Sequence, residues 1–164
     1  MSATREVLCN TSPLYYLHQL GWLDLLPSLY GRLTIPEAVV LELREGGRLG
    51  HAVPAVEALP WITVAQVEQA ALLRMATDLD AGEREVLALA VGRPGCLVLV
   101  DDGQARRYAT MLGVTFTGTL GVLIRAKRDG LLDEVRPCVD KLQALRFRIA
   151  PALRESVLRT VGEQ

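Results

Sequence analysis

Three groups of polar residues follow short apolar runs of this chain, and their side chains could hold a metal ion. The groups are Asn10-Thr11-Ser12, Asp101-Asp102 and Thr117-Gly118-Thr119. If the apolar runs are parallel strands, all three groups lie at one edge of the sheet, where open α/β sheets bind their ligands. Amide, hydroxyl and carboxylate oxygens are the donors that a hydrated divalent cation prefers. The spacing therefore predicts a cation site at this edge.

Asp101 and Asp102 are adjacent carboxylates directly before a predicted helix that begins near Gly103. One Asp is well explained as the helix cap, but a cap needs only one of the two. Because neighbouring carboxylates repel each other, a bound cation or a nearby Arg would help to keep both ionised. Asp101 adjoins the apolar run and is the better ligand candidate, and Asp102 is the better cap, although the two could exchange roles. Arg106 and Arg107 follow closely and could contact a phosphate, although simple solvation explains at least one of them.

Two glutamates are further candidates, and each has an ordinary structural explanation. Asp80 and Glu83 have the spacing of a capping box, in which Glu83 folds back onto the start of its helix. Glu83 also heads the apolar stripe that continues at Val86 and Leu87, so it faces inward and needs a partner or a metal. From the residues alone we favour the capping interpretation. Glu42 lies on a predicted helix and is by itself interpreted as a half-solvated surface acid.

Short apolar runs alternate with amphipathic stretches along the chain. The predicted strands are 6–9, 33–35, 61–64, 96–100 and 114–116, with a short extended segment at 147–149. The predicted helices are 13–20 (capped by Ser12), 22–30, 36–45 (ended by Gly46 and Gly47), 54–59, 66–75, 80–91, 103–112, 119–128, 133–145 and a last one from 151. This alternation predicts an α/β fold with a parallel or mostly parallel sheet and helices on both faces.

The composition is that of one ordinary globular domain, which we expect to span 1–164. Of the 164 residues, 50% are apolar and 23% are charged, and the net charge is -1, so overall basicity gives no sign of nucleic-acid binding. Residues 1–92 hold six basic and eleven acidic side chains, whereas residues 93–164 hold twelve basic and eight acidic ones. This asymmetry could place an acidic metal site beside a phosphate-binding surface, or could arise by chance in solvated faces.

Several other kinds of function have no support in the sequence. The three cysteines, Cys9, Cys96 and Cys138, match no zinc spacing and indicate a reducing, cytoplasmic protein without disulfides. The first residues lack the apolar run of a signal peptide, and no stretch is long and apolar enough to span a membrane. There is neither a nucleophile elbow nor a Gly-rich phosphate loop, which argues against covalent catalysis and nucleotide cofactors.

Five short motifs occur in order along nearly the whole chain. They are Asn10-Thr11-Ser12-Pro13-Leu14, Ile35-Pro36-Glu37-Ala38-Val39, Leu79-Asp80-Ala81-Gly82-Glu83, Val100-Asp101-Asp102 and Thr117-Gly118-Thr119-Leu120-Gly121. This succession resembles the PIN-like proteins of prokaryotes, specifically a branch catalogued as a domain of unknown function. The resemblance implies a three-layer α/β/α sandwich with a mostly parallel central sheet, whose acidic residues hold Mg²⁺ or Mn²⁺ and cut single-stranded RNA. It also implies a homodimer and a small antitoxin protein as partner, since many PIN proteins are toxins of toxin–antitoxin pairs.

The resemblance also assigns roles to individual residues. Glu42, Glu83 and either Asp101 or Asp102 match the acidic ligands of the family. Asn10 stands where most active PIN nucleases have Asp, and it can offer a carbonyl oxygen but no charge. The hydroxyl residues that match the polar turns near the site are Thr11, Ser12, Thr117 and Thr119.

Three hypotheses about function follow. The first is metal-assisted hydrolysis of RNA, in which Glu83 and Asp101, with Asn10 and Glu42 in support, hold one or two ions. The second is a degenerate PIN-like domain that binds RNA or a protein without cutting, and the uncharged Asn10 favours it. The third is a purely interacting protein, such as an antitoxin-bound or dimeric regulator, with an interface on the apolar helices and the segment from residue 133.

Overall fold

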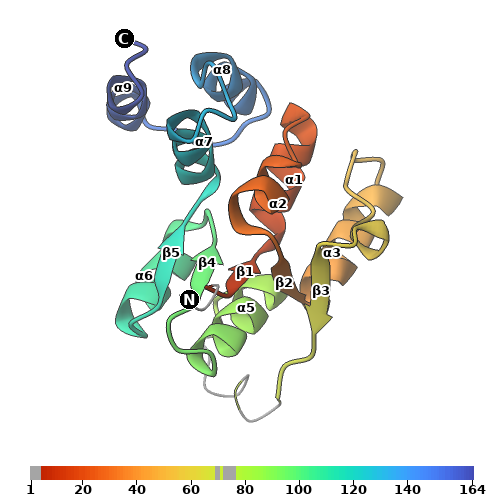
Figure 1. Cartoon of the computed structure of the whole chain (residues 1–164). Coiled ribbons are helices and arrows are strands. Elements are labelled where there is room, and N and C mark those ends of the chain that lie inside the picture. Colours follow the sequence, from red (N-terminus) through yellow and green to blue (C-terminus); the bar gives the residue numbers. More distant parts are fainter. Residues whose placement is uncertain (1–4, 69–70, 72–76) are drawn as a thin grey trace.

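The computed structural model describes residues 5–68, 71 and 77–164 of the chain. Its five strands form one sheet in the order β3-β2-β1-β4-β5, and every described pairing is parallel. The strands are β1 (Val7–Cys9), β2 (Leu33–Pro36), β3 (Ile62–Ala65), β4 (Leu97–Leu99) and β5 (Thr115–Thr117). Helices cover both faces of the sheet (Figure 1), so the predicted three-layer α/β/α sandwich is confirmed.

The described part of the chain contains eight α-helices and one short 3-10 helix. They are α1 (Thr11–Leu20), α2 (Leu25–Tyr30), α3 (Glu37–Arg48), η1 (Val56–Ala58), α5 (Ala81–Val91), α6 (Gly103–Met111), α7 (Thr119–Arg128), α8 (Arg136–Ala144) and α9 (Pro151–Thr160). The helix predicted at 66–75 falls mostly outside the described residues, and the segment 147–149 pairs with no described strand. Within the described ranges, none of the helices is long and apolar enough to cross a membrane.

Alternate residues of the central strands build two separate hydrophobic cores. Val7 and Cys9 of β1 pack with α1, α2, α3, α7 and α8 on one face of the sheet. Leu8, between them, packs with α5 and α6 on the other face. Burial on both faces explains why the central strands are continuous apolar runs rather than alternating ones. Cys9, Cys96 and Cys138 are buried and free.

The order of the strands brings the end of β1 next to the end of β4. β1 pairs with β2 on one side and with β4 on the other, so the connections run in opposite directions from it. Cys9 lies opposite Leu99, and the backbone N–H of Asn10 donates to the carbonyl of Leu99 at 3.0 Å. Such a switch point is where open α/β sheets leave a crevice for ligands. The topology therefore places Asn10 beside the pair Asp101-Asp102.

The start of α1 differs from the sequence prediction. The predicted cap at Ser12 is wrong, because α1 begins at Thr11 with Asn10 at the N-cap position. The hydroxyl of Ser12 donates instead to Asp101, at 2.7 Å. Pro13 lies in the first turn, where a residue without an N–H loses no hydrogen bond. A long-range contact has thus displaced the local capping pattern.

The end of α3 also differs, since the helix passes through Gly46 and Gly47 and continues to Arg48. A Cβ added at these two glycines would lie 3.4 and 3.1 Å from the side chain of Val53. The glycines therefore let the following loop pack closely onto the helix. The helix ends instead before Gly50, which has a φ of +94°.

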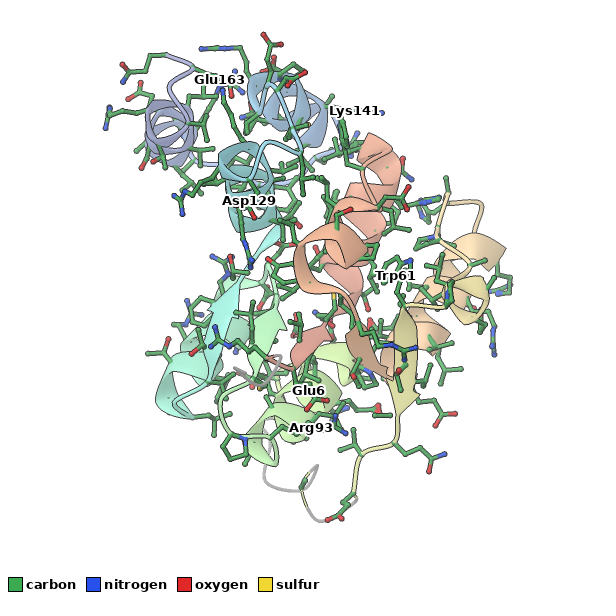
Figure 2. The ribbon with its side chains drawn as sticks, in the orientation of Figure 1. Glu6, Trp61, Arg93, Asp129, Lys141 and Glu163 are labelled. Atoms are coloured by element: carbon green, nitrogen blue, oxygen red, sulfur yellow. The ribbon has the colours of Figure 1, made fainter. Side chains whose placement is uncertain are left out.

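Glu163 ties the C-terminal helices together. Its carboxylate accepts hydrogen bonds from the backbone N–H groups of Val135 and Arg136 (2.7 and 2.9 Å) and from Lys127 Nζ (2.9 Å). Figure 2 shows Glu163 beside the ends of α8 and α9. Because the N-cap residue of α8 is Val135, which has no capping group, Glu163 caps this helix from a distance. Burial acts to raise the pKa of Glu163, but these hydrogen bonds outweigh burial and hold the pKa below its ordinary value.

We expect Glu163→Gln to lower the free energy of unfolding by about 1–3 kcal/mol, because an amide nitrogen cannot replace a carboxylate oxygen as an acceptor. Urea unfolding monitored by circular dichroism measures the effect. Glu155→Gln, on an exposed position of α9, is the matched control and should change stability by less than about 0.5 kcal/mol. Equal stability of the two variants would contradict the capping role of Glu163.

Candidate active site

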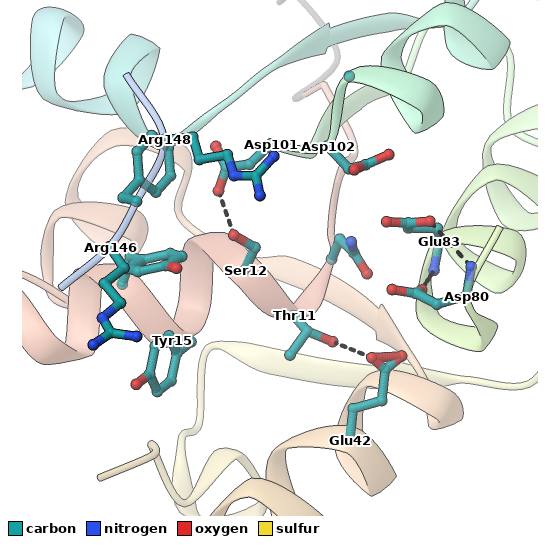
Figure 3. Close-up of a pocket in the computed structure, with 14 residues that line it drawn as sticks. Thr11, Ser12, Tyr15, Glu42, Asp80, Glu83, Asp101, Asp102, Arg146 and Arg148 are labelled. Carbon is teal, nitrogen blue, oxygen red and sulfur yellow. Dashed lines mark hydrogen bonds between the residues drawn. The ribbon is translucent and has the colours of Figure 1, made fainter. Parts of the chain in front are cut away.

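A cavity of about 700 Å³ opens at the carboxyl ends of β1 and β4 (Figure 3). Its lining residues come from the segments after β1 and β4, from α1, α3 and the start of α5, and from the connection between α8 and α9. They are Asn10, Thr11, Ser12, Tyr15, Tyr16, Glu42, Asp80, Glu83, Asp101, Asp102, Gly103, Arg146, Phe147 and Arg148. The acidic candidates Glu42, Glu83, Asp101 and Asp102 thus share one cavity with Asn10.

Two buried oxygens in this cavity have no hydrogen-bond partner among the described residues. They are Oδ1 of Asn10, a residue that is only 4% exposed, and Oε1 of Glu42. The other oxygen of Glu42 accepts from Thr11 Oγ1 at 3.2 Å. A buried acceptor without a donor is costly, and a cation is one partner that removes this cost.

The same two oxygens approach the first turn of α5 at Gly82. A Cβ added there would lie 2.9 Å from Asn10 Oδ1 and would collide with Glu42 Oε1. Gly82 is buried and helical, so space rather than backbone conformation requires glycine here. The missing side chain of Gly82 is what lets the amide of Asn10 and the carboxylate of Glu42 come together.

We expect Gly82→Ala to reduce any activity of this cavity by at least about tenfold, because the methyl group must push Glu42 and Asn10 away from their positions. Helix propensity alone would favour Ala by about 1 kcal/mol, so a loss of function without a change of charge would identify the collision. The control is Gly92→Ala at the other end of α5, where the added Cβ would come no closer than 3.7 Å to its neighbours. Activity equal to that of this control would contradict the steric argument.

Glu83 combines the two roles that the sequence left as alternatives. Asp80 Oδ1 accepts from the backbone N–H of Glu83 at 2.8 Å, and Glu83 Oε2 accepts from that of Asp80 at 3.1 Å, so the capping box is present. Glu83 is also only 8% exposed and lines the cavity. Burial raises the pKa of Glu83 to about 7, and the charges of Asp80 and Asp102 act in the same direction. Burial, and then the charge of Asp80, also raise the pKa of Glu42. The acidic side of the cavity, formed by Glu42, Asp80 and Glu83, therefore disfavours further negative charge.

The raised pKa of Glu83 predicts a pH-dependent stability. The folded protein holds the proton up to about pH 7, whereas a free Glu side chain releases it near pH 4.5. Between these values the folded state binds more protons than the unfolded state, so stability falls as pH rises. We expect the metal-free protein to lose up to about 3 kcal/mol relative to Glu83→Gln across this window. Denaturant unfolding of both proteins at several pH values checks this, and parallel stability curves would contradict it.

Asp101 and Asp102 have different local partners. Asp102 caps α6 by accepting from the backbone N–H groups of Gln104 and Ala105, each at 3.0 Å, as the capping pattern predicts. Asp101 accepts from Ser12 Oγ and from both the N–H and the hydroxyl of Thr119, all at 2.7 Å. Asp101 is therefore held rigidly between β4, α1 and α7. Both carboxyl groups line the cavity, and the charge of Asp102 is the one that acts on Glu83.

The residues expected to contact RNA separate into two groups. Thr11 and Ser12 line the cavity, whereas Arg106, Arg107, Thr117 and Thr119 are not among its lining residues. Arg106 Nε donates to the carbonyl of Val100 at 2.9 Å, and its guanidinium lies 5.4 Å from the ring centroid of Phe116. Thr119 is fully buried, and it positions Asp101.

Sequence reasoning missed seven residues of the cavity. They are Tyr15, Tyr16, Asp80, Gly103, Arg146, Phe147 and Arg148. The sequence predicts Asp80 only as a helix cap, whereas Asp80 both caps α5 and lines the cavity. The three residues from the connection between α8 and α9 have no local signal. The excess of basic residues after position 92 is the only sequence feature that points toward them.

The donor chemistry of the cavity fits a hard divalent cation. All the candidate donors on its acidic side are oxygens, and two of them are buried and lack a partner. Mg²⁺ and Mn²⁺ prefer such oxygen donors to nitrogen or sulfur. As the side chains stand, no three His, Cys, Asp or Glu residues in the described ranges are close enough together to hold one ion. The arrangement is thus an oxygen-rich pocket and not a closed metal cage.

Comparison with known proteins agrees with this architecture. A family model described as a PIN domain matches residues 6–163 of the chain. A search of curated proteins finds no match. PIN domains have a nuclease fold and generally use divalent metals. Since the match covers the parallel sheet and every residue that lines the cavity, the chain belongs to the PIN-domain family.

Proposed function

We propose that this protein is a divalent-metal-dependent ribonuclease that hydrolyses single-stranded RNA in the cavity at the ends of β1 and β4. One observation carries the proposal. The partnerless oxygens of Asn10 and Glu42 lie in the same cavity as Glu83, whose pKa is raised by burial and by neighbouring carboxylates. A cation would relieve both the unpaired acceptors and the charge repulsion.

Asn10, Glu42, Glu83 and Asp101 or Asp102 would hold Mg²⁺ or Mn²⁺. When bound, such an ion lowers the pKa of a water molecule and neutralises charge on the phosphate. The chain's own residues prepare this site. Thr11 orients Glu42 through its hydroxyl, and Glu83 can take up or release a proton near neutral pH.

Water is the proposed nucleophile. Ser12 lines the cavity, but its hydroxyl donates to Asp101, and no described histidine lies there to activate it. A serine nucleophile needs a base positioned to take its proton. Ser12 and Thr119 instead hold Asp101 in one orientation, which is the role we assign to them. No protein-bound intermediate is then formed.

The test is cleavage of a mixed-sequence single-stranded RNA by the purified native protein with Mn²⁺, Mg²⁺ or EDTA. We expect cleavage with a metal ion and none with EDTA, because without the ion nothing lowers the pKa of the attacking water or neutralises the charge that develops on the phosphate. A double-stranded RNA of the same sequence is the substrate control. Cleavage that persists in EDTA would contradict the proposal.

A second function is favoured by Asn10, which contributes no charge to the site. In this alternative the protein is a catalytically degenerate PIN-like domain that binds RNA or a protein. Saturable binding of RNA in the presence of Mn²⁺, without cleavage over hours, would support it. Metal-dependent cleavage by the native protein would exclude it.

The family further suggests a biological role, and we extend the proposal to it. The protein would be the toxin of a toxin–antitoxin pair and a homodimer, neutralised by a small antitoxin protein. Its expression should arrest growth, and co-expression of a neighbouring small reading frame should relieve the arrest. Sedimentation of the purified protein measures the oligomeric state, and a monomer at micromolar concentration would contradict the dimer.

A further inference from the structure

Six described helices end with the same pair of backbone hydrogen bonds, and one of them carries an unusual residue. In each case a residue in the left-handed conformation donates to the carbonyl three positions earlier, and the next residue donates to the carbonyl five positions earlier. At the ends of α1, α3, α6, α7 and α9 the left-handed residue is glycine. These glycines are Gly21, Gly50, Gly113, Gly130 and Gly162. At the end of α8 it is Arg146.

Arg146 adopts this conformation against its own preference. Its φ is 68°, and it is the one non-glycine residue with positive φ in the part of the chain that the structure describes. A Cβ makes the left-handed region unfavourable, which is why glycine usually ends helices in this way. Residues held in such a conformation are characteristic of functional sites. The conformation of Arg146 therefore makes its side chain a candidate for a functional role.

That side chain belongs to the rim of the cavity. Arg146, Phe147 and Arg148 all line it. Figure 3 shows the two arginines across the cavity from the carboxylates of Asp80 and Glu83. Both arginines are exposed, and within the described ranges neither side chain has a hydrogen-bond or ion-pair partner. Two guanidinium groups without a protein partner are thus available to an anionic ligand that lies over this cavity.

Aromatic rings accompany the two arginines. Phe147 packs edge-on against Tyr16, with ring centroids 4.9 Å apart, and Tyr16 packs in the same way against Tyr15 at 5.0 Å. Tyr15 lines the same cavity as Arg146. Rings next to cationic groups form the platforms on which single-stranded nucleic acids stack their bases while their phosphates are bound. An acidic peptide would meet the carboxylate wall without gaining such stacking.

We propose that residues 146–148 form an RNA-binding arm. Arg146 and Arg148 bind phosphates of the RNA strand that neighbour, along the same strand, the phosphate lying over the acidic side of the cavity. Tyr15 provides a ring face for a neighbouring base. Guanidinium groups suit this task because their donors fit phosphate oxygens in a bidentate way. The arm rests on the proposed function, since it names the groups that hold the RNA at that same cavity.

The test compares RNA affinity with thermal stability. Arg146→Gly should weaken binding of a fluorescein-labelled single-stranded RNA, measured by anisotropy in EDTA, by roughly tenfold. Each lost phosphate contact should reduce the slope of log K against log salt concentration by about 0.7. The same variant should raise Tm by roughly 2–6 °C, because glycine relieves the left-handed strain. A merely structural residue would not improve stability while losing affinity.

Further variants sharpen the result. Arg146→Asn tolerates the left-handed conformation without the charge and should bind as weakly as the glycine variant. Arg148→Ala should lower affinity by a similar factor with little change in Tm. Arg32→Ala is the matched control, since Arg32 is exposed at the opposite, amino-terminal edge of the sheet. It should leave RNA binding within about twofold of the native protein.

The outcomes separate the arm from the nuclease. If the native protein cleaves RNA but the Arg146 and Arg148 variants keep native affinity and KM, the arm is wrong and the nuclease stands. If RNA affinity depends on both arginines but no metal ion gives cleavage, the RNA-binding arm is supported and the proposed nuclease activity is contradicted. Three other results would each overturn the arm. They are an absence of RNA binding, competition by polyglutamate that is as effective as competition by unlabelled RNA, and a lower Tm for Arg146→Gly.

Discussion

Glu83→Gln is expected to reduce metal-dependent RNA cleavage by about 10²- to 10³-fold while the protein stays folded. Glutamine keeps the shape of the side chain and retains an oxygen that can accept the hydrogen bond from Asp80, so the capping box at the start of α5 survives. It removes the negative charge and the titratable proton that the buried carboxyl places in the cavity. Single-turnover cleavage of labelled RNA with Mn²⁺ measures the loss.

Glu85→Gln is the matched control for this experiment. Glu85 lies two residues further along the same helix and does not line the cavity. The Glu85→Gln variant should cleave RNA within about twofold of the native rate at equal Mn²⁺ concentration. If Glu83→Gln cleaves as fast as this control, Glu83 is no ligand, and the capping interpretation alone explains its position.

The second large effect is an increase in metal-dependent RNA cleavage. We expect Asn10→Asp to raise metal-dependent cleavage by tenfold or more, because it adds a charge at a buried oxygen that has no partner. In the absence of metal the same charge joins Glu42, Asp80 and Glu83, so the variant should melt several degrees below the native protein. Mn²⁺ should then raise the Tm of Asn10→Asp more than that of the native chain. Thermal scans over a Mn²⁺ titration, followed by RNA cleavage, measure both effects.

Asn10→Ala provides the comparison at the same position. It removes the orphan oxygen without adding charge and should bind Mn²⁺ no better than the native protein. If the native protein does not cleave RNA whereas Asn10→Asp does, the chain is a PIN domain that has lost its activity through the change of this one ligand. If neither Asn10→Asp nor the native protein responds to Mn²⁺ in stability or cleavage, the metal site is wrong.

Much of the fold was predictable because it depends on local signals. The apolar run before Asp101 is continuous because β4 is covered on both faces, and this pattern needs no knowledge of its neighbours. The capping box of Asp80 and Glu83 likewise marked the start of α5. Errors arose where a distant residue overrode a local pattern. Ser12 has a good capping side chain, yet its hydroxyl is engaged by Asp101, 89 residues away in the chain.

The acidic half of the site was predictable for a topological reason. Parallel strands place all their carboxyl ends at one edge of the sheet, and the pairing of β1 with β4 then makes the residues that follow these two strands neighbours. Asn10 and Asp101 are neighbours for this reason. The cationic half was not predictable, because nothing in the sequence around Arg146 indicates that the chain returns to the cavity after α8. The contact between Phe147 and Tyr16 brings it there.

The sequence by itself determined the periodic elements, the parallel direction of the strands and the edge at which the carboxylates gather, because these follow from hydrophobic pattern and chain direction. Only the tertiary structure decided that Glu83 has a pKa near 7, that Gly82 must lack a side chain, and that Arg146 reaches the cavity rim. Desolvation, charge repulsion and steric contact depend on distance through space, and the linear spacing of residues does not contain that distance.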